Sequence, residues 1–204
     1  MALLSETEVQ QVASAIEALE RKTDAELVTV LARQADDYHY IPTLWAALVA
    51  LVSPGIALLT PFWLGVGEVL TIQAVVFIVF AVVLRLPFIL RRIIPAKIKH
   101  WRASNLARRQ FLENNLHHTD GETGMLFFVS ETEHYVEIIA DRGISQFITD
   151  EEFSEIVQAF TLQVKAGKTL EGFLEAINKC GEKLIEHVPA TSTRNELPNH
   201  MILI

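Results

Sequence analysis

Acidic side chains that follow two predicted strands have the types and positions of a metal site. Apolar runs at 27–31 and 135–140 are typical of strands, and carboxylates come after each of them. Ligands of open α/β sheets tend to bind beyond the carboxyl ends of strands, so these carboxylates would meet if the two strands ran parallel. Because Ca²⁺ and Mg²⁺ prefer oxygen ligands, the sequence predicts a divalent-cation site. The candidate ligands are Asp36, Asp37 and Asp141, which the loop residues Asp120 and Glu122 could join.

The same loops could instead handle phosphate. A phosphatase needs a nucleophile or a metal-activated water, and groups that neutralise the phosphoryl charge. Arg142 is a candidate for the second role, together with the hydroxyl of Thr119. No nucleophile and no serine, histidine and aspartate triad can be assigned from spacing. Acidic and hydroxyl residues are also common in turns because they bond local backbone amides, so a purely structural role is the third interpretation.

Cysteine and histidine offer little support for a zinc site. The single cysteine, Cys180, excludes both an internal disulfide and a cysteine-based zinc cage, and its helical spacing predicts a packed core thiol. His39 stands apart, and His117 and His118 are adjacent, so they lack the i, i+4 spacing that puts two imidazoles on one helix face. A hard cation held by oxygen ligands is therefore the better prediction.

A long apolar run interrupts the elements that would position these residues. Between positions 41 and 84, Glu68 is the only charged side chain. A transmembrane helix needs about 20 mostly apolar residues, so this run is long enough for two crossings. We expect a membrane hairpin with crossings at about 43–63 and 69–88 and a turn at 65–68.

Basic residues gather on one side of this hairpin. The stretch 85–109 holds 8 of the 17 Lys and Arg residues and no acidic residue, although the whole chain has 25 Asp and Glu. Because basic residues resist translocation, both termini are expected in the cytoplasm and the turn outside. Five of these residues, called the basic collar below, are expected to meet anionic lipid: Arg91, Arg92, Lys97, Lys99 and Arg102. No nucleic-acid partner is expected, because the rest of the chain is strongly acidic.

The two arms that flank the hairpin read as one α/β domain. Ser5 with Glu8, and Thr149 with Glu152, are capping-box pairs that open helices. Neither arm alone has enough strands to close a core, so the hairpin is expected to interrupt a single fold. The predicted segments are the first part of the domain at 1–40, the hairpin at 41–90, the collar helix and the remainder of the domain at 91–189, and an irregular tail at 190–204.

Short stretches spread along both arms are similar to one known domain family. They are the early helix with the Glu26-Leu-Val-Thr-Val strand, Phe111, the His118-Thr119 loop, the Met125-Leu-Phe-Phe-Val strand, the Asp141-Arg-Gly-Ile turn, the Cys180-Gly181 helix and Asn195-Glu-Leu-Pro198. In these features the chain resembles the TPM domain. More closely, it resembles the bacterial membrane branch of that family, in which a transmembrane hairpin follows the first strand.

The resemblance implies a fold and a choice of functions. It implies a TPM-like α/β sandwich, with a central sheet flanked by helices, in the bacterial inner membrane. Relatives include a protein with reported acid-phosphatase activity and domains reported to bind calcium. We therefore expect a divalent-cation-binding or partner-binding module in membrane or envelope maintenance, whose partners are the lipid bilayer and a membrane protein. The alternatives are a metal-dependent acid phosphatase that uses Ca²⁺ or Mg²⁺, and a scaffold that binds no ion.

Overall fold

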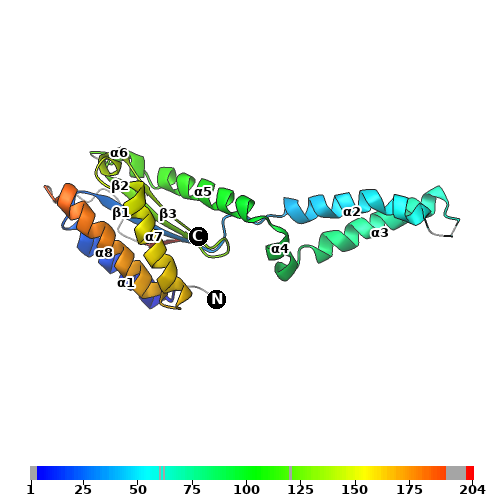
Figure 1. Ribbon diagram of the computed structural model, residues 1–204, viewed down its shortest axis with the longest axis horizontal. Coiled ribbons are helices and arrows are strands. Elements are labelled where there is room, and N and C mark those ends of the chain that lie inside the picture. Colours follow the sequence, from blue (N-terminus) through cyan, green and yellow to red (C-terminus); the bar gives the residue numbers. More distant parts are fainter. Residues whose placement is uncertain (1–3, 60, 62, 120, 192–200) are drawn as a thin grey trace. The chain divides into compact units, whose positions relative to one another are not determined.

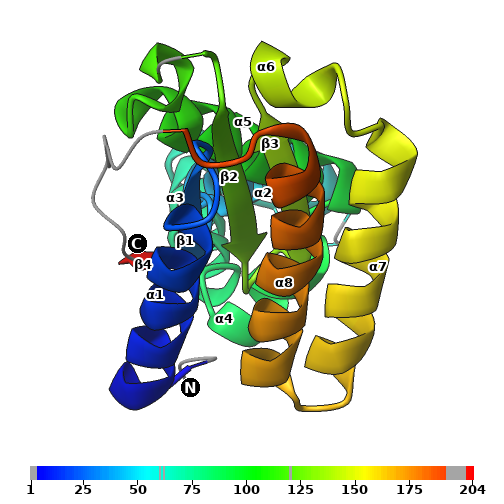
Figure 2. The same cartoon turned by 90° about the vertical axis from the view of Figure 1, so that its left-hand side faces the viewer.

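A computed structural model describes residues 4–59, 61, 63–119, 121–191 and 201–204. Within these residues, four strands form one sheet in the order β3-β2-β1-β4 (Figures 1 and 2). The strands are β1 (Glu26–Ala32), β2 (Gly124–Ser130), β3 (Tyr135–Ala140) and β4 (Met201–Leu203). β1 runs parallel to both β2 and β4, whereas β3 is antiparallel to β2. The sheet is therefore mixed, and its two central strands are parallel.

The chain divides into two compact units. The first, called the body, comprises Met1–Ala35 and His100–Ile204, and the second, called the hairpin unit, comprises Asp36–Lys99. The body contains the whole sheet, although its two halves are separated in the sequence by the hairpin unit. This arrangement confirms a mixed α/β fold with the apolar helices inserted after the first strand.

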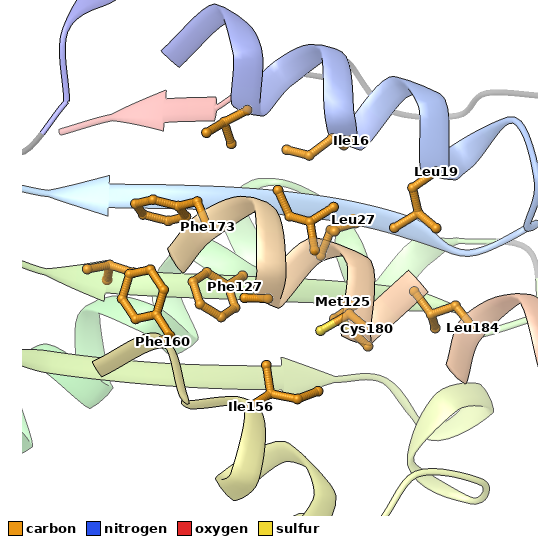
Figure 3. Close-up of a cluster of buried hydrophobic side chains, with 14 of the residues drawn as sticks. Ile16, Leu19, Leu27, Met125, Phe127, Ile156, Phe160, Phe173, Cys180 and Leu184 are labelled. Carbon is orange, nitrogen blue, oxygen red and sulfur yellow. The ribbon is translucent and has the colours of Figure 1, made fainter. Parts of the chain in front are cut away.

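Both faces of the two central strands are covered. Every residue of β1 and β2 is buried, as expected for unbroken apolar runs in the middle of a sheet. One face packs against α1 (Glu6–Glu20), α7 (Asp150–Lys165) and α8 (Thr169–His187). Phe127 of the sheet, Phe160 and Phe173 meet there edge to face, at ring-centroid distances of 4.8–5.8 Å (Figure 3). This aromatic cluster forms the centre of the larger core.

The opposite face of the sheet packs against α5 (Ala96–Glu113). Val28 and Val30 of β1 and Phe128 of β2 point to this side, because successive strand residues alternate between the two faces. Ala103 and Ala107 of α5 are buried in the same cluster as these strand residues. The short helix η1 (Leu116–His118) follows and buries Leu116 in the same cluster.

The predicted helix starts are confirmed. Ser5 accepts a bond from the Glu8 amide while the Glu8 side chain accepts from the Ser5 amide, and Thr149 and Glu152 do the same at α7. Each pair satisfies two amides that lack partners inside the helix. Cys180 is 1 % exposed among the core residues of α8, which confirms the prediction of a packed thiol.

The hairpin unit contains two long apolar helices, α2 (Tyr40–Leu58) and α3 (Val66–Val83), followed by α4 (Pro87–Ile93). In the described part of the chain, these two long helices are long and apolar enough to cross a membrane. The helix begins earlier and ends earlier than predicted: α3 starts at Val66, within the predicted turn at 65–68, and stops at Val83, and a new helix begins at Pro87. Leu86 is extended, which is the conformation that a following proline favours.

The C-terminal tail contains a strand that the sequence pattern does not reveal. The prediction that 190–204 is irregular is wrong for its last residues, because Met201–Leu203 forms β4. β4 pairs with Thr29–Leu31 of β1. A three-residue strand is too short to show a period of two, and it forms only because the edge of β1 offers partners for its backbone.

Candidate functional site

The strand directions separate the carboxylates that were expected to meet. β3 returns antiparallel beside β2, with Ala140 opposite Met125 and Tyr135 opposite Ser130. The end of β3 therefore lies beside the beginning of β1 and β2, and the Asp141 amide bonds the Gly124 carbonyl there at 2.9 Å. Asp36 and Asp37 follow the other end of β1 in the chain. The condition under which these carboxylates would meet, parallel first and third strands, is therefore not fulfilled.

Asp36 and Asp37 make local contacts in the hairpin unit. The Tyr38 amide donates to Asp36 Oδ1 at 2.9 Å, which is a turn stabilised by the side chain. Tyr38 has a positive φ of 54° and packs with Ile41 and Ile94 in a small apolar cluster. Asp37 lies 3.8 Å from the exposed His39. This segment acts as a structured turn at the start of α2.

The other predicted residues do gather at one end of the sheet, where the loop 119–123 meets the turn after β3. The Gly143 amide donates to the Glu122 carbonyl at 2.9 Å. A Cβ at Gly143 would clash with the backbone carbonyls of Gly121 and Glu122, so the two loops can touch only because this residue is glycine. Glu122 itself has a φ of 57°, a conformation that non-glycine residues rarely adopt. We call this group of residues (119, 121–123 and 141–143) the loop site.

Side chains of the loop site mostly bond to their own backbone. Asp141 accepts from the Arg142 amide at 2.8 Å and so caps the short helix α6 (Arg142–Ser145). The buried Thr119 hydroxyl donates to the Leu116 carbonyl and accepts from the Thr123 amide. Arg142 is exposed at the start of α6. Thr119 therefore supports the loop, and Arg142 is the group that remains accessible to an anion.

The described residues do not assemble a metal centre. Among them, no group of three or more His, Cys, Asp or Glu side chains is placed to hold a metal ion. Asp141 and Glu122 share the loop site, whereas Asp120 lies outside the described residues. Ca²⁺ takes about 6–8 oxygen ligands. A calcium ion at this end of the sheet would therefore need ligands in addition to the Asp141 and Glu122 carboxylates.

The basic collar lies on α4 and α5. Arg92 and Lys97 are exposed, and Lys99 is half-buried. Arg102 lies over the ring of Trp101, with 4.8 Å between its guanidinium carbon and the ring centroid. Arg91 is in α4, but its side chain lies outside the described residues. The collar thus presents cations on helices that directly follow the second apolar helix in the chain.

A buried carboxylate that sequence reasoning missed holds the chain where it leaves the sheet. Glu133 is 3 % exposed and bonds both the Ser130 hydroxyl and the Ala35 amide, the latter at 3.1 Å. Nearby, the Thr132 hydroxyl donates to the Arg33 carbonyl at 2.8 Å. The β2–β3 turn therefore clamps the segment that follows β1. No local signal marks Glu133, since an acidic residue in a hairpin turn is ordinary.

A second, partly buried carboxyl group lies at the other end of β1. Glu20 of α1 accepts a hydrogen bond from the Leu27 amide at 2.9 Å. Leu27 lies before the part of β1 that pairs with β4, which is Thr29–Leu31. Burial raises the pKa of Glu20 to about 8. Its other oxygen, Oε2, has no hydrogen-bond partner among the described residues. Glu20 therefore provides a hydrogen-bond partner for the edge of β1, but its own carboxyl group is poorly solvated.

Comparison with known proteins agrees with this architecture. Residues 91–183 match the family model of the TPM domain. The fold is similar to the NMR structure of the BA42 protein from the psychrophilic bacterium Bizionia argentinensis, with a TM-score of 0.60 and 17 % identity over 99 % of this chain and 96 % of that chain. At this identity the likeness concerns the fold alone. No curated protein matches the chain. Residues 91–183 are therefore the part of the chain that matches the TPM domain, and two apolar helices follow the first strand of the sheet in the chain.

Proposed function

We propose that the protein is anchored in a bacterial inner membrane by α2 and α3, and that its body serves as a partner-binding module in membrane or envelope maintenance. The observation that carries the proposal is the exposure of α3, in which none of the residues Val66–Val83 is buried. Leu70, Val75 and Ile78 are each more than half exposed. A helix that is apolar all round needs lipid or a large core around it, and α3 is not covered by a core.

The charge distribution supports an orientation with both termini in the cytoplasm. The described turn between the two helices carries no Lys or Arg, whereas the basic collar follows α3 closely. Cations near the end of a crossing stay on the cytoplasmic side, where anionic headgroups attract each of them by about 1 kcal/mol. The exposed Arg92 and Lys97 are best placed for that contact.

Labelling of single cysteines tests both the anchoring and the orientation. Gly67→Cys adds a thiol in open space near the start of α3, and Lys97→Cys adds one in the collar. The native Cys180 contributes little background, because burial raises the pKa of its thiol to about 12. An impermeant maleimide added to spheroplasts should label Gly67→Cys at once, and Lys97→Cys only after lysis. The reverse pattern would overturn the orientation, and release of the protein by alkaline carbonate would overturn the anchoring.

Cation binding at the loop site is a second candidate. It is favoured by the strained Glu122 and by the close approach of Gly143 to the 121–122 backbone, since strained residues cluster at ligand-binding sites. In this proposal Ca²⁺ or Mg²⁺ binds Asp141 and Glu122, with Asp120 as a further ligand, and Asp36 and Asp37 take no part.

Calorimetric titration of the full chain in detergent with CaCl₂ or MgCl₂ separates these candidates. Asp141→Asn should abolish the binding heat, whereas the matched variant Asp36→Asn should retain it. Equal losses in both variants would contradict a site confined to the loops. An absence of heat in the wild-type protein would leave the partner-binding module, or a scaffold that binds no ion.

A further inference from the structure

The outer edge of β3 is open. β3 is the last strand of the sheet on its side, and its described neighbour in the sheet is β2. In any strand, about half of the N–H and C=O groups point to each side, so a strand with one neighbour presents a row of groups without ladder partners. All residues of β3 are partly exposed. The opposite edge differs, because β4 pairs with β1 there.

A hollow lined by residues of β3 and α7 lies beside this open edge. Its volume is about 340 Å³, which is within the range of small ligand sites. Val136 and Ile138 of β3 and Phe153 of α7 provide apolar lining. Strand side chains alternate between faces, so a segment laid along β3 would direct every second side chain into this hollow.

Acidic residues flank the hollow and the open edge. Asp150 lines the hollow, whereas the Glu137 side chain lies on the other face of β3, beside Ser104 of α5. No Lys, Arg or His lines the hollow. Glu137 is held by the Ser104 hydroxyl at 3.5 Å and the Tyr135 hydroxyl at 3.0 Å. The Asp150 side chain, in the first turn of α7, makes no hydrogen bond or ion pair within the described residues. A cationic side chain is therefore the complementary group.

We infer that β3 and α7 form a binding site for an extended segment of a partner protein in which apolar and basic residues alternate. Such a segment adds a strand to the sheet. Its backbone pairs with the open edge of β3, its apolar side chains fill the hollow, and a Lys or Arg on its other face reaches Glu137. Binding of this kind takes its affinity from main-chain bonds and its specificity from alternate side chains. A second copy of this chain is a poorer occupant, because edge-to-edge pairing would bring two Glu137 carboxylates near each other.

The direct test uses the full-length protein in detergent and a capped eight-residue peptide of alternating valine and lysine. We expect binding with a Kd below about 1 mM, and slower amide hydrogen exchange in β3. Two control peptides separate the contributions: one replaces lysine by glutamate, and the other keeps the sequence but carries N-methyl groups on alternate amides. Both controls should bind at least about tenfold more weakly. Equal binding by either control, or no binding of the lysine peptide at millimolar concentration, would overturn the inference.

Matched variants locate the site. Glu137→Gln should weaken binding of the lysine peptide by about two- to fivefold, the effect of one exposed ion pair, whereas Glu151→Gln in the first turn of α7 should not. Ser154→Trp fills the hollow and should abolish binding, whereas Glu155→Trp, next along the helix and outside the lining, should retain it. Loss in both members of a pair would show that the peptide binds elsewhere.

Discussion

Helices α8 and α3 have almost the same length but differ in burial: one face of α8 is buried in the core, whereas α3 has no buried residue. α8 (Thr169–His187) places Phe173, Ile177 and Leu184 in the core and charged residues outward. α3 (Val66–Val83) is far more apolar, yet none of its residues is buried. The difference teaches that apolar content by itself does not make a core. An apolar stripe on one face packs against the protein, whereas an apolar surface all round is suited to lipid.

Truncation of a core phenylalanine is expected to have the largest effect on the stability of the body. Phe173→Ala removes a side chain that is 0 % exposed and contacts the rings of Phe127 and Phe160. We expect the free energy of unfolding of the body to fall by about 3–5 kcal/mol in a urea titration followed by fluorescence. Phe77→Ala in α3, where the ring is 36 % exposed, should leave that value within about 0.5 kcal/mol. Similar losses in the two variants would remove the contrast between the helices.

Adding a single methyl group to glycine should also distinguish the two units. At Gly124 a Cβ would clash with the backbone carbonyl of Leu116, so Gly124→Ala should destabilise the body by about 1–3 kcal/mol. At Gly67 a Cβ meets nothing within 4 Å, and alanine there should favour the helix by about 1 kcal/mol. Thermal melts followed by circular dichroism would measure both effects. A neutral Gly124→Ala would mean that η1 can move away from the sheet.

Titration of the partly buried Glu20 carboxyl group is expected in the body. The folded pKa of Glu20, about 8, lies above the ordinary value of 4.5, so its contribution to stability is full below about pH 4.5 and is lost as the pH rises to 8. The loss is at most about 1.4 kcal/mol for each pH unit. Glu20→Gln should therefore make the free energy of unfolding less dependent on pH between 5 and 8. Parallel curves for the two proteins would contradict the raised pKa.

The smallest effect concerns a helix cap. The Thr149 hydroxyl accepts from the Glu152 amide at the start of α7, and Thr149→Ala should cost about 1 kcal/mol in urea unfolding. At the start of α3 the corresponding residue is Gly65, whose amide bonds the Glu68 carboxylate at 2.8 Å. Gly65→Ala should therefore change the stability of the protein less than Thr149→Ala does. A larger change at Gly65 would show that the hairpin depends on its caps as the body does.

Much of the fold could be predicted because its signals are local. Each of these signals is contained in one short stretch of sequence. They are the capping pairs Ser5 with Glu8 and Thr149 with Glu152, the buried run of β1 and the uniform apolar character of α3. The loop site could be predicted only in part. Thr119, Glu122, Asp141 and Arg142 do lie at one end of the sheet, but Asp36 and Asp37 follow the other end of β1.

The long helices, the three longer strands and the interrupting apolar hairpin could be predicted from the sequence, because hydrophobic period and capping act between near neighbours. Contacts between distant segments settle which ends of the strands meet, the pairing of Met201–Leu203 with β1, and the bond between Glu133 and Ala35. Strand direction and register depend on backbone bonds between segments far apart in the chain. The open edge of β3 is of the same kind, since it exists only because no other described strand takes that place.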